Sequence, residues 1–229
     1  MEIIAHVRTD FPTKFGVPRQ SGLIDALEAR VVFTPPYRSR DALRGLDGFS
    51  HLWLIWQFSQ ALREGWSATV RPPRLGGNVR MGVFATRSPY RPNPIGLSCV
   101  RLEGIDLDAP DGPVLRVRGA DMLDNTPVYD IKPYLPLSDC HPEAAGGFAA
   151  PQAERALRVE FPPELLRRVP ARARAALVQV LAQDPRPAYQ QDPDRLYGVP
   201  FAGVDVRFSV EGDALTVRDV VPYEEGAGR

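Results

Sequence analysis

The chain has 229 residues, enough for one large domain or for one domain with a small appendage, and either can bury a core. Its 28 basic and 28 acidic residues balance to zero, which excludes a global electrostatic attraction to nucleic acid or membrane. There is no apolar leader or long apolar run, Cys99 and Cys140 lack metal or disulfide spacing, and the three histidines are scattered, so we expect a cytoplasmic protein without a metal or a membrane segment.

The predicted elements are mostly strands. Runs of β-branched, aromatic or alternating apolar residues predict strands at residues 1–9, 29–34, 50–59, 82–86, 97–107 and 113–123. The proline- and glycine-rich residues 10–23 predict a loop. Residues 39–49 predict a short helix with Ser39 as its N-cap and Gly45 near its end, and residues 128–139 predict a further extended segment closed by prolines.

The order of these elements predicts a mainly β protein. Many strands with few helices between them favour an antiparallel β-barrel over residues 1–140 and do not fit a Rossmann sheet. The small and polar residues 141–156 predict a linker. Residues 157–229 predict a small α+β C-terminal domain, with a helical stretch at 162–183 and a hairpin at 204–222.

The stretch "MGVFATRSPYRPNPIGLS", residues 81–98, predicts a rigid loop between apolar segments. Its prolines fix φ and remove hydrogen-bond donors, so it suits neither a helix nor a central strand. A rigid loop holds Arg87, Arg91 and Asn93 at fixed positions, as recognition of an anionic or planar ligand requires. A loop that serves only packing is the alternative.

The same region is locally basic although the chain is neutral. No acidic residue lies between Glu64 and Glu103. The arginines in this interval are Arg71, Arg74, Arg80, Arg87, Arg91 and Arg101. Such a run is either a solvated face or, because it coincides with the rigid loop, the binding surface of an anionic partner.

Four long segments carry a resemblance to a known family. They are "GVPRQSGL", "GFSHLWLIWQF", "RMGVFATRSPYRPNPIGLS" and "DMLDNTPVYDIKPYLP". In this order they resemble the TsaA-like family, specifically its tRNA N6-threonylcarbamoyladenosine N6-methyltransferases. The C-terminal "VLAQDPRPAY" is similar to the longer bacterial members, which carry the extra domain.

The resemblance implies a fold and an activity. Members are β-barrel enzymes that use S-adenosylmethionine and work as homodimers with the cofactor near the subunit interface. They methylate the exocyclic nitrogen of threonylcarbamoyladenosine at position 37 of threonine tRNAs. Two alternatives stay open, namely an S-adenosylmethionine-dependent methyltransferase for another acceptor and a non-catalytic barrel that binds an RNA loop.

The family's motifs also imply cofactor-binding residues. Carried over by position, they are Pro18, Arg19, Gln20, Ser59, Gln60, Arg87, Leu97, Asp124, Asn125, Thr126 and Pro127. Arg87 suits a carboxylate or phosphate because its guanidinium forms two parallel hydrogen bonds. Asp124 and Asn125 could accept hydrogen bonds from the cofactor, or they could serve only the turn that their side chains favour.

A proton acceptor is expected beside the reacting nitrogen, which is part of a urea and a poor nucleophile while protonated. The candidates are Asp124, Asp130, His51 and Tyr134. For RNA the candidates are Arg71, Arg74, Arg80, Arg91 and Lys132, acting mainly through phosphates.

Each of these assignments has a structural alternative. We expect His51 to be a core histidine that a backbone carbonyl satisfies, and Trp53, Trp56 and Phe58 to be core residues rather than base-stacking platforms. Lys132 could pair with Asp130 instead of binding RNA. Arg91 could brace its own loop.

Overall fold

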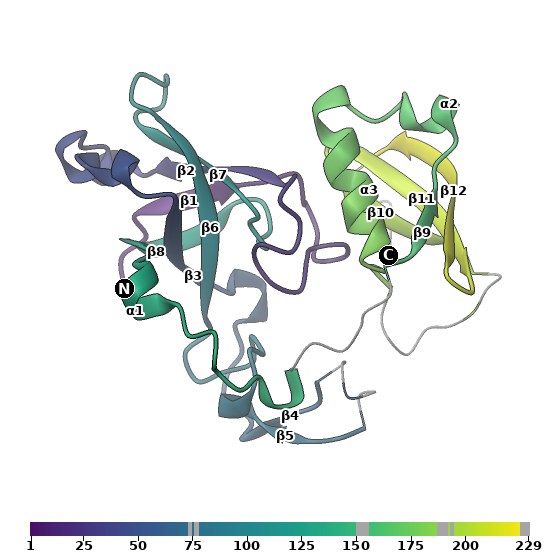
Figure 1. Ribbon diagram of the computed structural model, residues 1–229, viewed down its shortest axis with the longest axis horizontal. Coiled ribbons are helices and arrows are strands. Elements are labelled where there is room, and N and C mark those ends of the chain that lie inside the picture. Colours follow the sequence, from purple (N-terminus) through teal and green to yellow (C-terminus); the bar gives the residue numbers. More distant parts are fainter. Residues whose placement is uncertain (73–74, 76–77, 150–155, 187–191, 193–194, 225–229) are drawn as a thin grey trace.

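The computed structural model describes the whole chain except residues 73–74, 76–77, 150–155, 187–191, 193–194 and 225–229. Its described strands form three groups: a closed barrel, a four-stranded C-terminal sheet and a two-stranded ribbon (Figure 1). Two hydrophobic cores accompany them, one inside the barrel and one at the C-terminal sheet. The mainly β fold with an α+β C-terminal part is confirmed.

The barrel closes in the order β1-β2-β7-β6-β3-β8, and every neighbouring pair is antiparallel. Its strands are β1 (Ala5–Arg8), β2 (Glu28–Phe33), β3 (His51–Gln57), β6 (Ile95–Asp106), β7 (Val114–Arg118) and β8 (Thr126–Pro133). Side chains alternate across each strand. On β3, Leu52, Leu54 and Trp56 point into the core, which leaves His51 and Trp53 on the outer face.

The barrel strands lie where the sequence predicts them, but three predicted elements were wrong. Residues 82–86 are not a strand: β5 (Met81–Gly82) ends there, and a 3-10 turn at Val83–Ala85 buries only Val83. The helix predicted at 39–49 is two 3-10 turns, because Gly45 at φ 84° interrupts it and Ser39 caps neither. The extended segment 128–139 ends in α1 (Pro136–Asp139), since a proline is favourable at the first helical position.

The segment between β3 and β6, residues 58–94, is called the β3–β6 connection below. It contains the ribbon of β4 (Thr69–Val70) and β5, which lies below the barrel in Figure 1. Its return toward β6 is braced by Arg91, whose Nη1 donates to the carbonyl of Thr86 at 2.7 Å. The rigid-loop prediction therefore has a structural basis in both proline content and this arginine.

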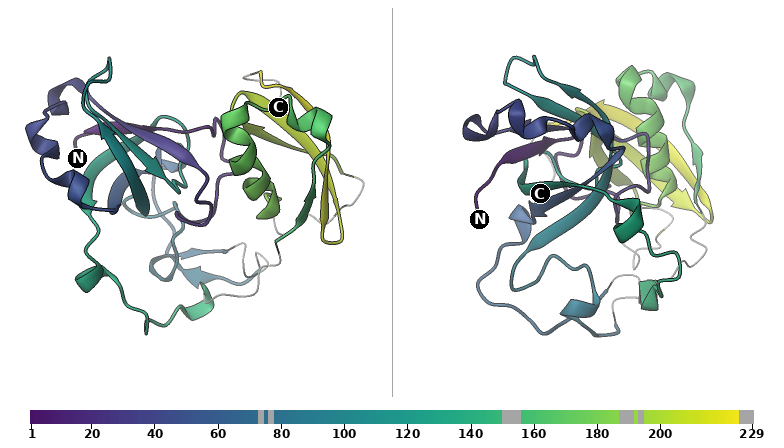
Figure 2. Two further views of the ribbon diagram at one scale, coloured as in Figure 1. Left: turned by 45° about the horizontal axis from the view of Figure 1, so that its top comes forward. Right: turned by 60° about the vertical axis from the view of Figure 1, so that its left-hand side comes forward.

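The C-terminal sheet has the order β10-β11-β12-β9, and α3 packs against it (Figure 2). Its elements are β9 (Arg158–Glu160), α2 (Pro163–Leu166), α3 (Arg174–Ala182), β10 (Tyr197–Phe201), β11 (Val204–Glu211) and β12 (Ala214–Pro222). The predicted hairpin is β11 and β12, whereas β10 was not anticipated. The single helical stretch predicted at 162–183 was wrong, because Pro170 separates α2 from α3.

The loop that follows β1 belongs to the C-terminal core as much as to the barrel. Phe11, Ile24 and Leu27 are buried among residues of α3 and the C-terminal sheet. The ring of Phe11 lies 4.9 Å from that of Phe201, centroid to centroid. The guanidinium of Arg172 donates to both carboxylate oxygens of Asp10, at 2.6 and 2.8 Å. Residues 10–27 are therefore fixed from the C-terminal side.

Candidate cofactor site and RNA surface

A chain of hydrogen bonds leads from the barrel interior to the surface. The indole Nε1 of Trp56 donates to Ser98 Oγ at 2.9 Å, and Ser98 Oγ donates to the carboxylate of Asp121 at 2.6 Å. Ser98 is fully buried and Trp56 is 6% exposed. Gly96 makes room for the indole, because a Cβ there would lie 2.2 Å from Trp56 Cε2. Every polar side-chain atom of this chain thus has a partner.

Asp121 is the charged end of this chain. Burial raises its pKa, while Ser98, the backbone amides of Asp121 and Ser21, and the guanidinium of Arg87 all act in the opposite direction. The carboxylate thus lies between the barrel and the loop after β1, where hydrogen bonds and a nearby cation offset its desolvation.

Arg87 and Gln20, both predicted cofactor ligands, meet at this point. The Arg87 guanidinium donates to the side-chain oxygen of Gln20 although the two residues are 67 positions apart. Ser21 joins the same loop to the barrel by accepting a hydrogen bond from the Cys99 amide at 3.2 Å. Pro18 and Arg19 precede Gln20 on this loop.

Asp121, Ser98 and Ser21 were not predicted as site residues. Their signal was present, because Asp121 opens the segment "DMLDNTPVYDIKPYLP" and Ser98 closes "MGVFATRSPYRPNPIGLS". Both segments were noted for their other residues. What the sequence did not show is that the two segments share a hydrogen bond.

The remaining predicted cofactor residues are distributed over other parts of the barrel. Ser59 and Gln60 are exposed in a 3-10 turn directly after β3. Asp124 accepts a hydrogen bond from the Thr9 amide at 3.0 Å and lies 3.6 Å from the Arg8 guanidinium, so its carboxylate holds the turn before β8 against β1.

The rest of this turn combines backbone strain with burial. Asn125 adopts φ 62°, as turn chemistry predicts. Thr126 and Pro127 are buried, and the Thr126 hydroxyl donates to the Leu123 carbonyl at 2.8 Å. This turn therefore offers a ligand Asp124, Asn125 and the backbone rather than the side chains of Thr126 and Pro127.

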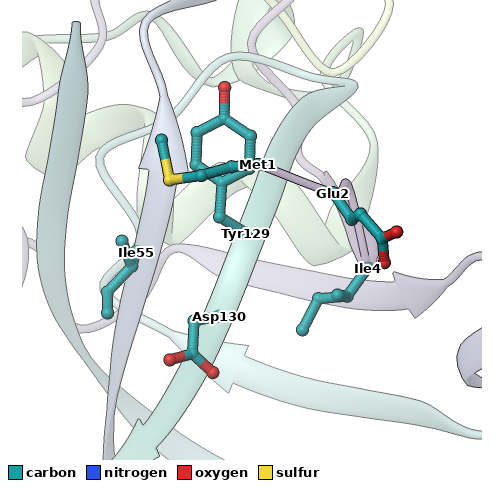
Figure 3. Close-up of a pocket in the computed structure, with 6 residues that line it drawn as sticks. All are labelled: Met1, Glu2, Ile4, Ile55, Tyr129 and Asp130. Carbon is teal, nitrogen blue, oxygen red and sulfur yellow. The ribbon is translucent and has the colours of Figure 1, made fainter. Parts of the chain in front are cut away.

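Two open depressions lie on the outer face of β3, β6 and β8. One, of about 390 Å³, is lined by Trp53, Ile55, Leu97, Lys132, Ser138, Asp139 and His141. The other, of about 500 Å³, is lined by Met1, Glu2, Ile4, Ile55, Tyr129 and Asp130 (Figure 3). They share Ile55, and Leu97 beside it is 55% exposed. Both have the size of small-molecule sites.

Three of the four candidate proton acceptors lie on this outer face. Asp130 lines the larger depression and pairs with Lys132 at 2.9 Å, as the alternative for Lys132 anticipated. Tyr134 lies against Trp53, with ring centroids 5.6 Å apart. Burial, followed by the neighbouring Cys140, raises the pKa of Tyr134 and keeps its phenol protonated near neutrality. Asp124 lies apart, at the turn beside β1.

His51 differs from its predicted environment. We expected a core histidine bonded to a carbonyl, but the alternation of β3 places His51 on the outer face, with Nδ1 2.9 Å from the Ser50 hydroxyl oxygen. Trp56 is a core residue and Phe58 packs against the core, as predicted. Trp53 lies outside, where its Nε1 donates to Asp139 at 2.8 Å.

The predicted RNA-binding arginines gather in the β3–β6 connection, while Lys132 lies on the outer face of β8. Arg80 donates to the Thr69 hydroxyl at 2.8 Å, and Arg91 braces its loop as described above. Arg71 follows β4. Arg74 lies outside the described residues.

Comparison with known proteins places both parts of the chain. The family model of the tRNA-methyltransferase O N-terminal domain matches residues 6–140, and that of the TrmO C-terminal domain matches residues 154–223. A tRNA (adenine(37)-N6)-methyltransferase of Escherichia coli is 44% identical, over 96% of this chain and 97% of its own. A Pseudomonas aeruginosa relative whose name describes an S-adenosylmethionine-dependent methyltransferase is 43% identical over 95% of both chains.

The crystal structure of TrmO from Pseudomonas aeruginosa superposes with a TM-score of 0.78 at 36% identity, covering 96% of this chain and 95% of that one. The fold and the site therefore define a β-barrel methyltransferase of the class that uses S-adenosylmethionine without a Rossmann sheet. The chain belongs to the tRNA-methyltransferase O (TrmO) family. Among the described residues, no helix is both long and apolar enough to span a membrane.

Proposed function

We propose that the protein transfers a methyl group from S-adenosylmethionine to the N6 nitrogen of N6-threonylcarbamoyladenosine at position 37 of threonine tRNAs. The observation that carries this proposal is the family match over both parts of the chain. The names of the relatives support tRNA adenine 37 as the site of methylation. The threonylcarbamoyl group and the threonine tRNAs rest on the resemblance of the motifs.

The described residues fit the cofactor. S-adenosylmethionine, when bound, supplies a methyl group on a positively charged sulfur. Arg87, oriented by Gln20 and Asp121, offers a planar cation for its carboxylate. Leu97 and Ile55 offer an exposed apolar wall, and Asp124 and Asn125 offer acceptors for its hydroxyl and amino groups. We propose that Pro18, Arg19, Ser59 and Gln60 complete the binding site through the loop after β1 and the turn after β3.

Methyl transfer to nitrogen is an in-line displacement at carbon, so orientation by the protein supplies much of the rate. Effective molarities of about 10⁵ to 10⁸ M are available from orientation alone. A carboxylate that accepts the nitrogen's proton assists. Asp130 suits this role best among the four candidates, because it faces a depression and Lys132 favours its charged form.

We propose that the protein works as a homodimer in the cytoplasm, where its tRNA substrate is found. The exposed Leu97 beside Ile55 on the outer barrel face supports the dimer, because exposed apolar residues that line a depression favour a partner surface. Residues 1–140 would form the catalytic barrel, 141–156 the linker and 157–229 the C-terminal domain.

The test supplies purified protein and methyl-labelled S-adenosylmethionine with threonine tRNA that carries or lacks the threonylcarbamoyl group. The labelled nucleoside is then identified by mass after digestion. Label on the modified adenosine alone supports the proposal. Label on the unmodified tRNA as well would remove the threonylcarbamoyl requirement, and cofactor binding without label on either tRNA would indicate another acceptor. Binding of RNA without cofactor binding would indicate the non-catalytic barrel.

A further inference from the structure

Two aromatic side chains are exposed side by side on the β3–β6 connection. Trp66 is 55% exposed and Phe84 is 72% exposed. Their rings are stacked, with centroids 6.0 Å apart and planes inclined by 30°. Trp66 precedes β4 and Phe84 lies in the turn after β5, so pairing of β4 with β5 brings them together. Neither ring fills a core, and neither belongs to the cofactor site described above.

Arginines lie over the aromatic rings of the same connection. The guanidinium carbon of Arg63 is 4.0 Å from the ring centroid of Tyr90, which is itself 40% exposed. That of Arg91 is 6.0 Å from the ring centroid of Phe84. Planar guanidinium groups and aromatic rings at the surface are the two side-chain types on which unstacked bases stack.

The charge of the connection also selects an anionic partner. No acidic residue occurs from position 65 to 102. Within the described parts of the chain, no carboxylate forms an ion pair with Arg63, Arg71, Arg80 or Arg91. A second copy packed on this patch about a two-fold axis would bring the same arginines against them, which is unfavourable. RNA brings phosphates.

We propose that Trp66 and Phe84 form a base-stacking platform for single-stranded nucleotides of the tRNA anticodon loop, with the arginines of the β3–β6 connection on the adjacent phosphates. The proposal rests on the proposed function only for the identity of the RNA. The platform would hold an unstacked nucleotide beside the catalytic barrel. It adds two recognition residues, Trp66 and Phe84, that the sequence motifs did not single out.

The test measures binding of an unmodified threonine anticodon stem–loop RNA, without cofactor, to three variants. We expect the double variant Trp66→Ala/Phe84→Ala to bind roughly 5- to 150-fold more weakly, the range that loss of one stacked base produces. Trp66→Leu/Phe84→Leu, which keeps an apolar surface without a π-face, should lose most of the same affinity. Trp66→Phe should retain it. Val79→Ala, at a 49% exposed apolar position of the same connection, is the matched control.

Salt dependence separates stacking from charge. The leucine double variant should leave the slope of log Kd against log salt unchanged, whereas Arg80→Ala should reduce it by about 0.7 if that arginine contacts one phosphate. RNA affinity within twofold of the parent protein in both double variants would overturn the platform. So would parent-like affinity in the leucine variant alone, or a change of oligomeric state in the alanine variant.

Failure of the proposed function is distinguishable from failure of the platform. Both double variants should keep the parent affinity for S-adenosylmethionine, because Trp66 and Phe84 lie outside the cofactor site. If the parent protein binds the stem–loop through the platform but does not methylate threonylcarbamoyladenosine, the platform stands and the substrate assignment falls.

Discussion

Trp56, Ser98 and Asp121 show how single residues connect the barrel core to the cofactor site. Two short hydrogen bonds join them, and Asp121 faces the guanidinium of Arg87. A buried carboxylate is costly unless it is paired, and here the pairing orients a residue on another loop. Asp121 is therefore a positioning residue in the proposed mechanism.

Replacing Asp121 by Asn keeps an acceptor for Ser98 but removes the charge that faces Arg87. We expect affinity for S-adenosylmethionine to fall about tenfold, within the range for a hydrogen bond to a charged group. Isothermal calorimetry measures this. Asp108→Asn, at a carboxylate whose side chain is 81% exposed, is the control and should keep the parent affinity.

The same variant changes the pH dependence of stability. Because burial raises the Asp121 pKa above 3.8, the folded protein binds this proton more tightly than the unfolded chain. The contribution of Asp121 to stability is therefore lost as the pH rises from 3.8 through the raised value. We expect the Tm of Asp121→Asn minus that of the parent to increase over this interval. A constant difference would contradict the assignment.

Gly96 is the position where the barrel tolerates no side chain. A Cβ would lie 2.2 Å from Trp56 Cε2, so Gly96→Ala must displace the indole and break its hydrogen bond to Ser98. We expect a loss of about 1 to 3 kcal/mol in the free energy of unfolding, as overpacking costs. Urea denaturation of this variant beside Gly48→Ala, whose Cβ would meet nothing within 4 Å, measures it.

At the scale of elements, the loop after β1 joins the two cores. Its Gln20 reaches Arg87 on the barrel side, while Phe11, Ile24 and Leu27 are buried at the C-terminal sheet. Gly22 and Gly119 tie the loop to the barrel through a backbone hydrogen bond of 2.9 Å. The C-terminal part therefore has a physical role that its sequence did not show, because it fixes the loop that carries predicted cofactor residues.

Arg172→Ala tests this role. Its guanidinium makes a two-pronged ion pair with Asp10, which is the direct polar link between the loop and the residues before α3. The Arg172 side chain is 61% exposed, so we expect a stability loss below about 1 kcal/mol. Affinity for S-adenosylmethionine should fall about two- to fivefold, corresponding to a similar small free energy.

The control for this variant is Arg158→Ala. Arg158 pairs with Glu160 at 3.0 Å within β9 and does not contact the loop after β1. We expect equal or smaller loss of stability and parent-like cofactor affinity. Equal cofactor affinity in both variants would show that the ion pair does not position the loop.

At the scale of the whole molecule, the outer barrel face is the surface on which the proposed dimer depends. Leu97 and Ile55 are cross-strand neighbours on β6 and β3, and the depressions on either side share Ile55. Tyr134, Asp130 and Lys132 surround them on β8. A partner on this face would cover apolar surface and enclose depressions that are open in one chain.

Leu97→Glu would place a charge at the centre of this surface. We expect the dimer dissociation constant to rise at least about tenfold, because an unpaired charge buried at an interface is costly. Sedimentation equilibrium measures it. Leu107→Glu is the matched control, since Leu107 is 39% exposed just beyond the other end of β6. A dimer that is equally stable in both variants would exclude this face as the interface.

The sequence by itself determined the elements whose signal is local. Alternation along β3, the turn residues between strands and the long motif segments predicted the barrel, the C-terminal α+β part and the family. Local signals failed where a nonlocal or conformational feature decided the outcome. Gly45 in a left-handed conformation split the predicted helix at 39–49, and the apolar run 82–86 became a turn with Phe84 exposed.

Only the tertiary structure decided which distant residues meet. Gln20 reaches Arg87 across 67 positions, Trp66 stacks on Phe84 through the pairing of β4 with β5, and Phe11 enters the C-terminal core. Strand propensity depends on neighbours along the chain, so sequence shows it. Contacts between loops depend on strand register and barrel closure, which arise only when the whole chain packs.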